Sequence, residues 1–506
     1  MAVRQPTGWT SRSLWRTRAR ERVYRPVCCI LGVLPVELES PLPASLPAGS
    51  RVALYCSGTA SEDGRAVAGL RLLVDGRSHR PSAVAAPRPD TPCRRSGFWG
   101  VVPVMAGSAG TEVTLAAEVS LAGGGRRTVE LGRIPVTAPA GQTGRDPAPA
   151  TGGRAPLIAI CMGTFNPPPG LLERQLESIR RQSDEDWTCV ISDDHSDEAQ
   201  FEVLREAVAG DPRFTISRSP VRIGFYRNFE RALGLIPREA ALVALCDQDD
   251  IWHPDKLATL RDSLEDAALV YSDQRLVDSD GAVLRDTMWS GRANNFGNLA
   301  SMLVANTVTG AASLLRREVA EHSLPFPDSP GIEFHDHWIG LVALASGDIR
   351  YVERPLYDYV QHRGAVLGKV ARAGRGGPHR LGRAARGHWR AAYFLGYVPG
   401  AVRARTLLLR FGEQMPAGKR RALGRYLAAE HSLVGLVWML ARPLRALWGH
   451  TETLGTEWEL ARGILWKRAA LAVSHLPWPG RLAPDTRFPN PPHFEQRRMQ
   501  RWRSRV

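Results

Sequence analysis

Hydrophobic and polar positions alternate with a period of two along the first third of the chain, from residue 30 to residue 138. Runs such as 51–60, 69–76 and 98–105 carry apolar side chains at nearly every second position, and clusters of Gly, Pro and Ser separate them. Such alternation predicts β-strands that bury one face and expose the other. Several short strands at this spacing predict a small Ig-like β-sandwich over residues 30–138.

A different pattern begins at residue 157, where short apolar runs alternate with amphipathic segments. Strands that alternate with helices predict an α/β layer with a mostly parallel sheet. In such sheets ligands bind beyond the carboxyl ends of the strands. The predicted strands are 157–165, 187–194, 213–219 and 240–250, and the predicted helices are 170–183, 198–209 and 224–236.

The remaining segments lack both patterns. Residues 1–29 are rich in Arg and are predicted to be disordered. Residues 139–156 are rich in Pro, Gly, Ala and Thr, which is typical of a linker. Residues 369–506 contain basic amphipathic stretches and are predicted to be helical, which leaves 157–368 for the α/β domain.

The positive charge of the chain is concentrated near its C-terminus. The net charge is +15, whereas residues 370–506 alone hold 25 Lys and Arg against seven Asp and Glu, a local charge of +18. Arg and Trp on apolar helices favour binding to an anionic membrane surface. A helical cap packed on the α/β domain explains the same periodicity, so both interpretations stay open.

No apolar run reaches the ~18–20 residues that a membrane span requires. The seven cysteines form no CxxC pair and no regular spacing, which favours a reducing compartment over a disulfide framework. We therefore expect a cytoplasmic protein. If the basic region binds lipid, the protein lies at the inner face of the cell membrane.

Carboxylates crowd the ends of two predicted strands. Repulsion and desolvation make such clusters costly unless a cation or a solvated loop relieves them. Hard oxygen ligands suit Mg²⁺ or Mn²⁺ bound together with substrate phosphates. The alternative, a helix N-cap, accounts for one carboxylate but not for all of them. The residues are Asp193 and Asp194 after one strand, and Asp247, Asp249 and Asp250 after the other.

The stretch TFN…LLERQLESIRRQS…W…VISDDHSD…RIGFYRNFERAL…ALCDQDDIWHPDKL resembles the nucleotide-sugar domain of family 2 glycosyltransferases, which have the GT-A fold. Its DQDDIW form resembles the rhamnosyltransferase-like branch of that family. The resemblance covers about 157–368. It implies a fold class of α/β, with a GT-A domain preceded by a small β-sandwich and followed by a basic helical region.

The resemblance also implies a role for each matching residue. Asp193 would accept the imino N–H of a uracil or thymine base, which implies a UDP- or dTDP-sugar donor. The metal, Mg²⁺ or Mn²⁺, would be held by Asp249, Asp250 and His362. The residues implied to bind the nucleotide sugar are Thr164, Phe165, Asn166, Asp193, Asp194, Arg227, Asp247 and Gln248.

The segment GIEFHDHWIGLVAL resembles the part of the family that carries the general base, which maps to Asp336. The alternative for this residue is a cap for the helix predicted at 337–345. The histidines on either side, His335 and His337, are interpreted more simply as packed residues. In the closing motif, Gln361 and His362 are the residues that could reach the metal or the phosphates.

The function implied is an inverting, metal-dependent transfer of a sugar, rhamnose or another hexose, to a hydroxyl. A carboxylate removes the proton of the acceptor hydroxyl as that oxygen attacks the anomeric carbon. The acceptor would be a glycan or a lipid-linked hydroxyl in the synthesis of a cell-surface glycan or polysaccharide. No nucleic acid is expected as a partner, because the chain has no recognised motif for it.

Three positions depart from the family pattern. His195 stands where the DDGS turn usually has glycine, which requires an altered turn geometry. His337 replaces an aromatic residue, and Ala365 replaces an asparagine. These departures bear on the donor and the acceptor more than on the reaction. A non-catalytic carbohydrate-binding scaffold, a basic nucleic-acid-binding protein and a nucleotidyltransferase are the alternative functions.

Overall fold

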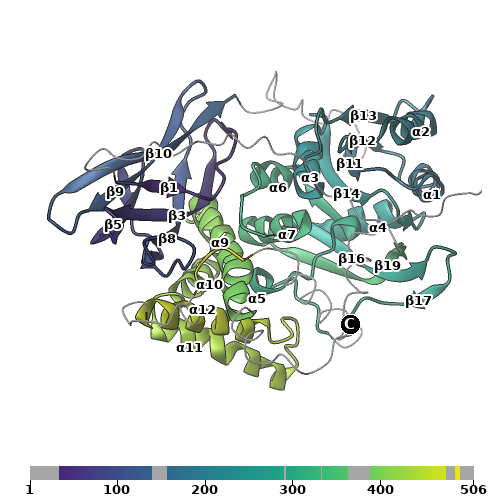
Figure 1. Ribbon diagram of the computed structural model, residues 1–506. Coiled ribbons are helices and arrows are strands. Elements are labelled where there is room, and N and C mark those ends of the chain that lie inside the picture. The colour runs from purple at the N-terminus through teal and green to yellow at the C-terminus, as the bar shows by residue number, and fades with distance from the viewer. Residues whose placement is uncertain are drawn as a thin grey trace, which may run out of the picture.

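The computed structural model describes residues 34–138, 157–289, 292–331, 333–362, 388–473 and 485–489. Within these ranges, two packed sheets are followed by a mixed sheet flanked by helices and then by a group of C-terminal helices (Figure 1). The predicted fold class, α/β with a β-sandwich before it and a helical region after it, is confirmed. The segments predicted as a disordered terminus and as a linker lie outside the described residues.

The β-sandwich has two antiparallel sheets, ordered β1-β3-β8-β7, with β4 paired to β3, and β2-β10-β9-β5-β6, in which β2 alone pairs in parallel. Their inner faces share one core, in which Leu72, Val102 and Val119 are fully buried. This core explains the period of two in the sequence. The strands are β1 Val36–Leu38, β2 Leu46–Pro47, β3 Arg51–Glu62, β4 Arg65–Ala66, β5 Gly69–Val74, β6 Arg77–His79, β7 Ala83–Ala86, β8 Gly97–Met105, β9 Glu112–Ser120 and β10 Arg126–Thr137.

The sheet of the α/β domain has the order β13-β12-β11-β14-β18-β16-β19-β15, with β17 paired to β16. The first four strands are parallel, and β18 runs antiparallel to both of its neighbours. Strands buried on both faces explain the continuous apolar runs of the sequence. Their bounds are β11 Leu157–Thr164, β12 Trp187–Asp193, β13 Phe214–Arg218, β14 Ala240–Asp247, β15 Ile251–Trp252, β16 Leu269–Asp278, β17 Val283–Arg285, β18 Ser313–Arg316 and β19 Ile349–Gln361.

Helices cover both faces of this sheet (Figure 1). Helices α1, α2 and α4 lie on one side, and α3, α6 and α7 lie on the other. The amide of Gln182 joins α1 to α4, because its Oε1 accepts the Leu257 N–H at 3.0 Å. The helices are α1 Pro169–Arg180, α2 Glu198–Val208, α3 Phe225–Gly234, α4 Lys256–Leu264, α5 Leu299–Val304, the short η1 Gly310–Ala312, α6 Arg317–Ser323 and α7 His335–Ser346.

The C-terminal helices fill the angle between the sandwich and the α/β domain (Figure 1). Thr406 Oγ1 accepts the N–H of Ala53 in β3 at 3.0 Å. Arg410 donates to the carbonyl of Arg51 at 2.9 Å and to that of Pro325 at 2.6 Å, so one side chain of α9 holds both parts. Among the described residues, no helix is long and apolar enough to cross a membrane. The helices are η3 Ala392–Tyr397, α9 Val398–Phe411, α10 Ala417–Ala428, α11 Leu433–Ala441, η4 Arg442–Trp448 and α12 Thr456–Ala472.

Candidate active site

The polar ends of three parallel strands meet at one edge of the α/β sheet. The register pairs Gly163 with Asp247 across β11 and β14, and Thr164 with Asp193 across β11 and β12. Each strand is a run of buried apolar residues up to this point, so the chain turns from core to polar loop at the same level in all three. The carboxyl ends therefore gather the predicted side chains, as expected for an open α/β sheet.

A cavity of about 770 Å³ opens at this edge. Its floor is made of the strand ends and the first turns of α3 and α7, and its far wall comes from the C-terminal helices. A cavity of this size holds a ligand as large as a nucleotide sugar. The predicted residues in its lining are Thr164, Phe165, Asp194, Asp247, Gln248, Asp249 and Asp336.

The other predicted residues stand behind this lining or beside it. They are Asn166, Asp193, Arg227, Asp250 and His362, none of which is among the residues that line the cavity. Asp193 and Asp250 are fully buried. His362 reaches the cavity only through a neighbour, since its Nε2 lies 2.7 Å from Asp249 Oδ2.

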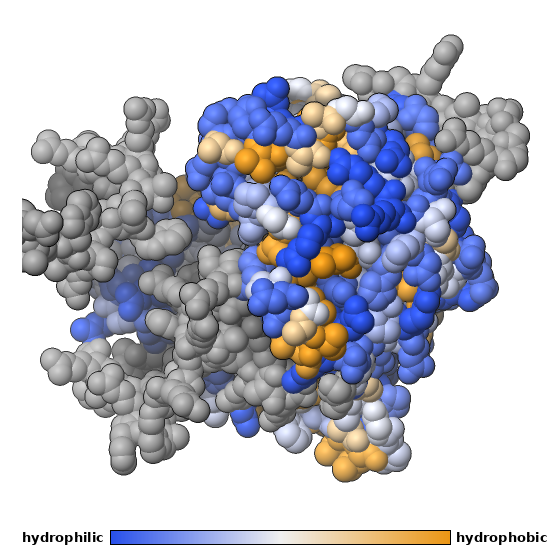
Figure 2. Space-filling view, turned by 90° about the vertical axis from the view of Figure 1, so that its right-hand side faces the viewer, coloured by the Kyte–Doolittle hydropathy of each residue, from blue (hydrophilic) through white to orange (hydrophobic). Residues whose placement is uncertain are grey.

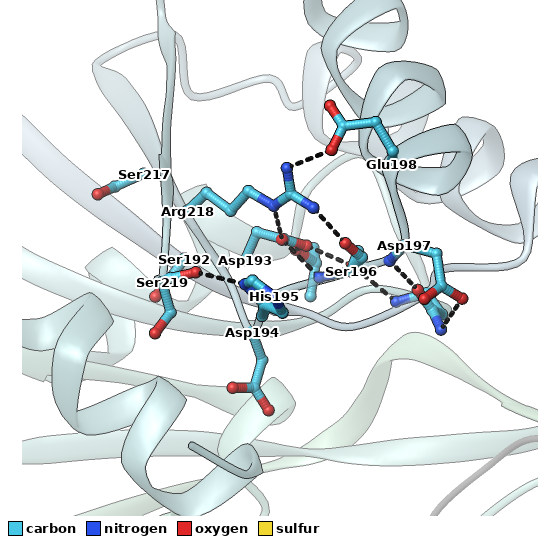
Figure 3. A network of polar contacts seen from close by, with 12 residues as sticks. Ser192, Asp193, Asp194, His195, Ser196, Asp197, Glu198, Ser217, Arg218 and Ser219 are labelled. Carbon is cyan, nitrogen blue, oxygen red and sulfur yellow. Dashed lines mark hydrogen bonds and ion pairs between the residues drawn. The ribbon is translucent and has the colours of Figure 1, made fainter. Parts of the chain in front are cut away.

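Asp193 and Asp194 have different surroundings in the loop after β12 (Figure 3). Asp193 accepts hydrogen bonds from Thr164 Oγ1 at 3.1 Å and from the N–H of Ser196 at 2.9 Å, and its Oδ2 lies 3.7 Å from Arg218. Asp194 accepts the N–H groups of Ile223 and Gly224, at 2.6 and 2.9 Å. The hydrogen bonds of Asp193 therefore hold the loop in place, while Asp194 lines the cavity.

Two residues at this edge have positive φ, Asn166 in the loop after β11 and His195 in the loop after β12. Asn166, with φ 41°, exchanges hydrogen bonds with Asp197: its Oδ1 accepts the Asp197 N–H at 2.8 Å, and its Nδ2 donates to Asp197 Oδ2 at 3.0 Å. His195 has φ 61°, the left-handed conformation that glycine adopts most readily. The residue thus keeps a glycine-like backbone in the turn. Its Nδ1 lies 3.1 Å from Ser219 O (Figure 3).

Arg227 is occupied by other partners. Its guanidinium donates to Glu230 and Asp328, and to Phe326 O at 3.0 Å, so it ties α3 to the segment after α6. The basic residue in the cavity lining on this side is Arg222, which the sequence analysis missed. Its guanidinium lies 3.9 Å from the centroid of the Phe165 ring. The exposed Arg222 and the half-buried Phe165 present a flat cationic surface on which a nucleobase can stack.

Burial and repulsion between carboxylates raise the pKa values of Asp247 and Asp250. Burial and the charges of Asp249 and Asp336 raise the pKa of Asp247 to about 7. The pKa of Asp250 is raised well above its ordinary value by burial and by the neighbouring carboxylates, and its Oδ2 has no hydrogen-bond partner among the described residues. Such a cluster can accept further positive charge, from protons or from a bound cation.

One buried cation, Lys256, lies beneath the cluster. The side chain is completely buried, its Nζ donates to Ala311 O at 2.5 Å, and it lies 3.4 Å from the centroid of Trp252. Burial lowers its pKa to about 7, against the attraction of Asp250 and Asp247. One partly protonated amine cannot neutralise three carboxylates. The sequence signal was the lysine of DQDDIWHPDK, which directly follows the acidic run.

None of the carboxylates that follow β14 caps helix α4, the simpler explanation considered for them. That helix begins at Lys256 with Asp255 at its N-cap, and no side-chain cap bond is formed. Gln248 instead fixes the loop: its Oε1 accepts the Phe165 N–H at 2.8 Å, and its Nε2 donates to Phe165 O at 3.3 Å.

The described residues contain no ready-made group of three or more His, Cys, Asp or Glu that could hold a metal ion. Asp249 and His362 offer two donors side by side at the cavity edge. A site with one or two protein donors fits Mg²⁺ or Mn²⁺ that takes its other ligands from substrate phosphates and water. The residues therefore fit a cation that arrives with the donor.

Asp336 lies in the first turn of α7. Burial raises its pKa to about 6, against the hydrogen bonds from the N–H groups of His337 and Gly310. The His337 N–H is 2.6 Å from its Oδ1. Because Phe334 is the N-cap and forms no side-chain cap bond, Asp336 is not the capping residue of this helix. Its carboxylate lines the cavity with a pKa suited to a base near neutral pH.

The two histidines beside Asp336 are packed, as interpreted from the sequence. His335 stacks on Phe229 with 3.6 Å between ring centroids, and burial lowers its pKa to about 3. His337 Nε2 lies 2.7 Å from Met302 O. Its Nδ1 lies 2.8 Å from Arg403 Nη1, whose charge is balanced by Glu333 at 3.0 Å. Both histidines hold the Asp336 turn in place.

The far wall of the cavity comes from residues that the sequence analysis did not connect with the site. Arg403 of α9 and Trp458, Glu459 and Arg462 of α12 line it, together with Arg292 from the segment before α5. They lie more than a hundred residues beyond the strand ends or in segments without a motif. Only the three-dimensional packing of the C-terminal helices brings them to the cavity.

The chain is similar to several known proteins. Residues 159–324 match the model of glycosyl transferase family 2. The uncharacterized protein y4gI of Sinorhizobium fredii is 32% identical over 123 residues, 24% of this chain and 13% of that protein. The uncharacterized glycosyltransferase MJ1057 of Methanocaldococcus jannaschii is 25% identical over 135 residues, 26% of this chain and 46% of that protein. The chain thus spans less than half the length of either relative.

Solved structures give two further similarities. TarS 1–349 of S. aureus, in complex with UDP-GlcNAc, has a TM-score of 0.39 and 13% identity, covering 63% of this chain and 91% of that one. The mannosyltransferase PcManGT of Pyrobaculum calidifontis, in complex with GDP-Man and Mn²⁺, has a TM-score of 0.35 and 18% identity, covering 66% and 91%.

The segment that matches glycosyl transferase family 2 lies in the α/β domain, with its strand ends at the cavity. The match agrees with the family that the sequence resemblance implied. The family match ends at residue 324, so Asp336 and His362 lie beyond the matched segment.

Proposed function

We propose that this protein transfers a sugar from a nucleotide sugar to an acceptor hydroxyl with inversion at the anomeric carbon. The observation that carries the proposal is the convergence of two kinds of carboxylate on one cavity. Asp247 and Asp249 lie at the end of β14, and Asp336 lies across from them in α7. Asp247 and Asp249 suit a donor whose diphosphate carries a divalent cation, and the position of Asp336 suits a base.

The donor occupies the part of the cavity formed by the strand ends. A uracil or thymine base stacks on Phe165 and Arg222, and the ribose and diphosphate lie toward Asp194 and Asp247. A UDP- or dTDP-sugar is therefore the proposed donor, with rhamnose or another hexose as its sugar. Asp193 acts on the base through the loop that it braces, because its own oxygens accept bonds from Thr164 and Ser196.

Asp336 is the proposed general base. Its carboxylate takes the proton of the acceptor hydroxyl while that oxygen forms its bond to the anomeric carbon and the bond to the diphosphate oxygen breaks. A single displacement by one base gives inversion. The α7 turn positions the carboxylate, since the packed His335 and His337 fix the residues on either side.

Mg²⁺ or Mn²⁺ is the proposed cofactor. When bound, the cation neutralises the diphosphate and stabilises it as a leaving group. Asp249 and His362 would hold it, with Asp250 behind them as a further negative charge. We propose a glycan or lipid-linked hydroxyl as acceptor, in the synthesis of a cell-surface glycan or polysaccharide at the inner face of the membrane.

The proposal is tested by donor binding, measured calorimetrically over a panel of UDP-, dTDP- and GDP-sugars with Mn²⁺, with Mg²⁺ and with EDTA. We expect one pyrimidine donor to bind in the presence of metal and to be lost with EDTA. The variant Arg222→Gln should weaken binding of that donor by roughly tenfold, through the lost stacking contact. Absence of binding by every sugar nucleotide under every metal condition would overturn the proposal.

A further inference from the structure

We propose that the outer surface of α11 and η4 docks on a lipid bilayer that contains anionic headgroups. This surface, named here the α11–η4 face, is made of apolar side chains that point away from the fold. They are Leu433, Val434, Val437, Leu440, Leu444, Leu447 and Trp448.

The exposure of the α11–η4 face is high. Val434 is 80% exposed, Leu447 78% and Trp448 73%. In the same helix Leu436 and Met439 are buried, and Gly435 packs so closely on α10 that a Cβ would lie 2.6 Å from its backbone. Helix α11 is thus apolar on all sides, with one side in the core and the other in solvent. An apolar patch marks the lower edge of the molecule in Figure 2, the level at which Figure 1 places the C-terminal helices.

The charges around the α11–η4 face indicate which kind of partner binds to it. Residues 417–473 contain nine Lys and Arg and four Glu, and none of these Glu is exposed. Lys467, Arg445 and Arg442 pair with the three buried ones, at 3.2, 3.1 and 3.3 Å. The Lys, Arg, Asp and Glu side chains of this segment that are exposed are all arginine: Arg420, Arg421, Arg425 and Arg462.

An apolar surface with only basic exposed charge in its segment complements a bilayer with anionic headgroups. The apolar side chains enter the interfacial layer, and the arginines attract the lipid phosphates. A Trp such as Trp448, at the end of η4, is the residue type that prefers this boundary. A second copy of the chain would bring the same positive charge to the face, so it is the less favourable occupant.

The face adjoins the cavity. Trp458 lines the cavity beside Arg462, and its Nε1 donates to the carbonyl of Leu440, a residue of the face, at 3.0 Å. An acceptor carried by a bilayer lipid would therefore reach the base from the α12 side. This last step rests on the proposed sugar transfer, whereas the docking itself does not.

The test is flotation of the full chain with vesicles of phosphatidylglycerol and phosphatidylcholine, and with vesicles of phosphatidylcholine alone. We expect the protein to float with the anionic vesicles and to lose that binding in high salt. The triple variant Val434→Ser, Leu447→Ser, Trp448→Ser should bind the anionic vesicles more weakly than the wild type, by roughly tenfold at least. Its melting temperature should equal that of the wild type, because the three side chains are already exposed to solvent in the folded protein.

A matched control carries three apolar-to-Ser changes elsewhere, at Met105, Val283 and Leu284, which are about half exposed. This variant should float like the wild type. Absence of flotation of the wild type, or equal flotation of the two triple variants, would overturn the proposal. A wild-type dimer in solution that the first variant dissociates would also overturn it, and would assign the face to a second copy. Flotation needs no sugar donor, so its failure is separate from failure of the proposed transfer.

Discussion

At the scale of single residues, the site depends on carboxylates whose surroundings differ. Asp336 lines the cavity from a half-buried position in a turn fixed by packed histidines, whereas Asp249 lies at the cavity edge beside His362. Environments that separate two carboxyl groups in this way commonly separate their roles as well. These surroundings support the proposed roles, proton removal for Asp336 and binding of the donor diphosphate through the metal for Asp249.

The substitution Asp336→Asn should reduce kcat by roughly 10²–10⁴-fold, the usual contribution of a general base. Donor affinity should change little, because the amide keeps the size of the side chain. In the wild type, kcat/KM should fall as the pH drops through about 6, since protonation removes the base. Initial rates across a pH series measure this. An unchanged kcat in the variant would exclude Asp336 as the base.

The substitution Asp249→Ala should weaken metal-dependent donor binding by roughly 100-fold, or about 2.7 kcal/mol. Titration calorimetry with Mn²⁺ and the preferred donor gives this number directly. Asp262→Ala, which removes an exposed carboxylate from α4, is the matched control and should bind like the wild type. Equal losses in both variants would mean that general charge, and not this site, governs donor affinity.

At the scale of elements, the sequence predicted those whose periodicity is local. The strands β11, β12, β13 and β14 and the helices between them lie within a few residues of their predicted bounds, because each buries a continuous apolar run or stripe. The short β15 and η1 carry no such pattern and were not predicted. Their positions depend on pairing with β19 and on contact with α7, which are set at long range.

The residues of the site also divide into those that the sequence could place and those that it could not. The family resemblance implied one site for Asp247, Asp249 and Asp336, and all three line one cavity because strand ends and helix starts meet at this sheet edge. Arg403 and Trp458 could not be placed, since nothing in their local sequence says which surface α9 and α12 cover. The resemblance implied Arg227 as the basic residue near the nucleotide, whereas Arg222, the exposed neighbour of Phe165, lines the cavity.

One network of buried side chains joins the elements around the C-terminal helices. Glu430 accepts from Tyr393, from Ser82 at 3.2 Å and from Lys467 at 3.2 Å, while Trp99 of the sandwich donates to Tyr393 at 2.9 Å. Burial alone would raise the pKa of Glu430, but the bonds from His431, Lys467 and Tyr393 overcome it and lower the pKa to about 2.

The substitution Glu430→Gln should therefore destabilise the protein by roughly 3 kcal/mol at neutral pH, because it leaves Lys467 buried without its charge partner. Since the folded pKa lies below the ordinary 4.5, this stability is present above about pH 4.5 and is lost as the pH falls toward 2. Melting temperatures across that range should drop more in the wild type than in the variant. The double variant Glu430→Gln, Lys467→Met should recover part of the loss, and no recovery would contradict the pairing.

At the scale of the whole molecule, the sandwich is part of the structural core and not a separate spacer. Ala53, Tyr55 and Trp99 belong to the same buried cluster as Tyr393 and Phe394 of η3. Trp99 packs edge-on against Phe394 with 5.2 Å between ring centroids. The sandwich thereby supports the helices that form the far wall of the cavity.

A chain that begins at residue 157, without the sandwich, should consequently expose the covered faces of η3 and α9. We expect a lower melting temperature and stronger binding of a hydrophobic dye than in the full chain. Dye fluorescence and thermal unfolding measure both. A truncated chain as stable as the full one, with no added dye binding, would show that the sandwich contributes nothing to the helical wall.

The most direct test of the account follows donor cleavage in real time by ¹H NMR, with the preferred nucleotide sugar, Mn²⁺-free Mg²⁺ buffer and water as acceptor. If the transfer is a single displacement with Asp336 as the base, the first sugar released has the anomeric configuration opposite to that of the donor, and Asp336→Asn releases it far more slowly. Retained configuration would contradict the single displacement. A donor that binds but is never cleaved would identify the domain as a carbohydrate-binding scaffold.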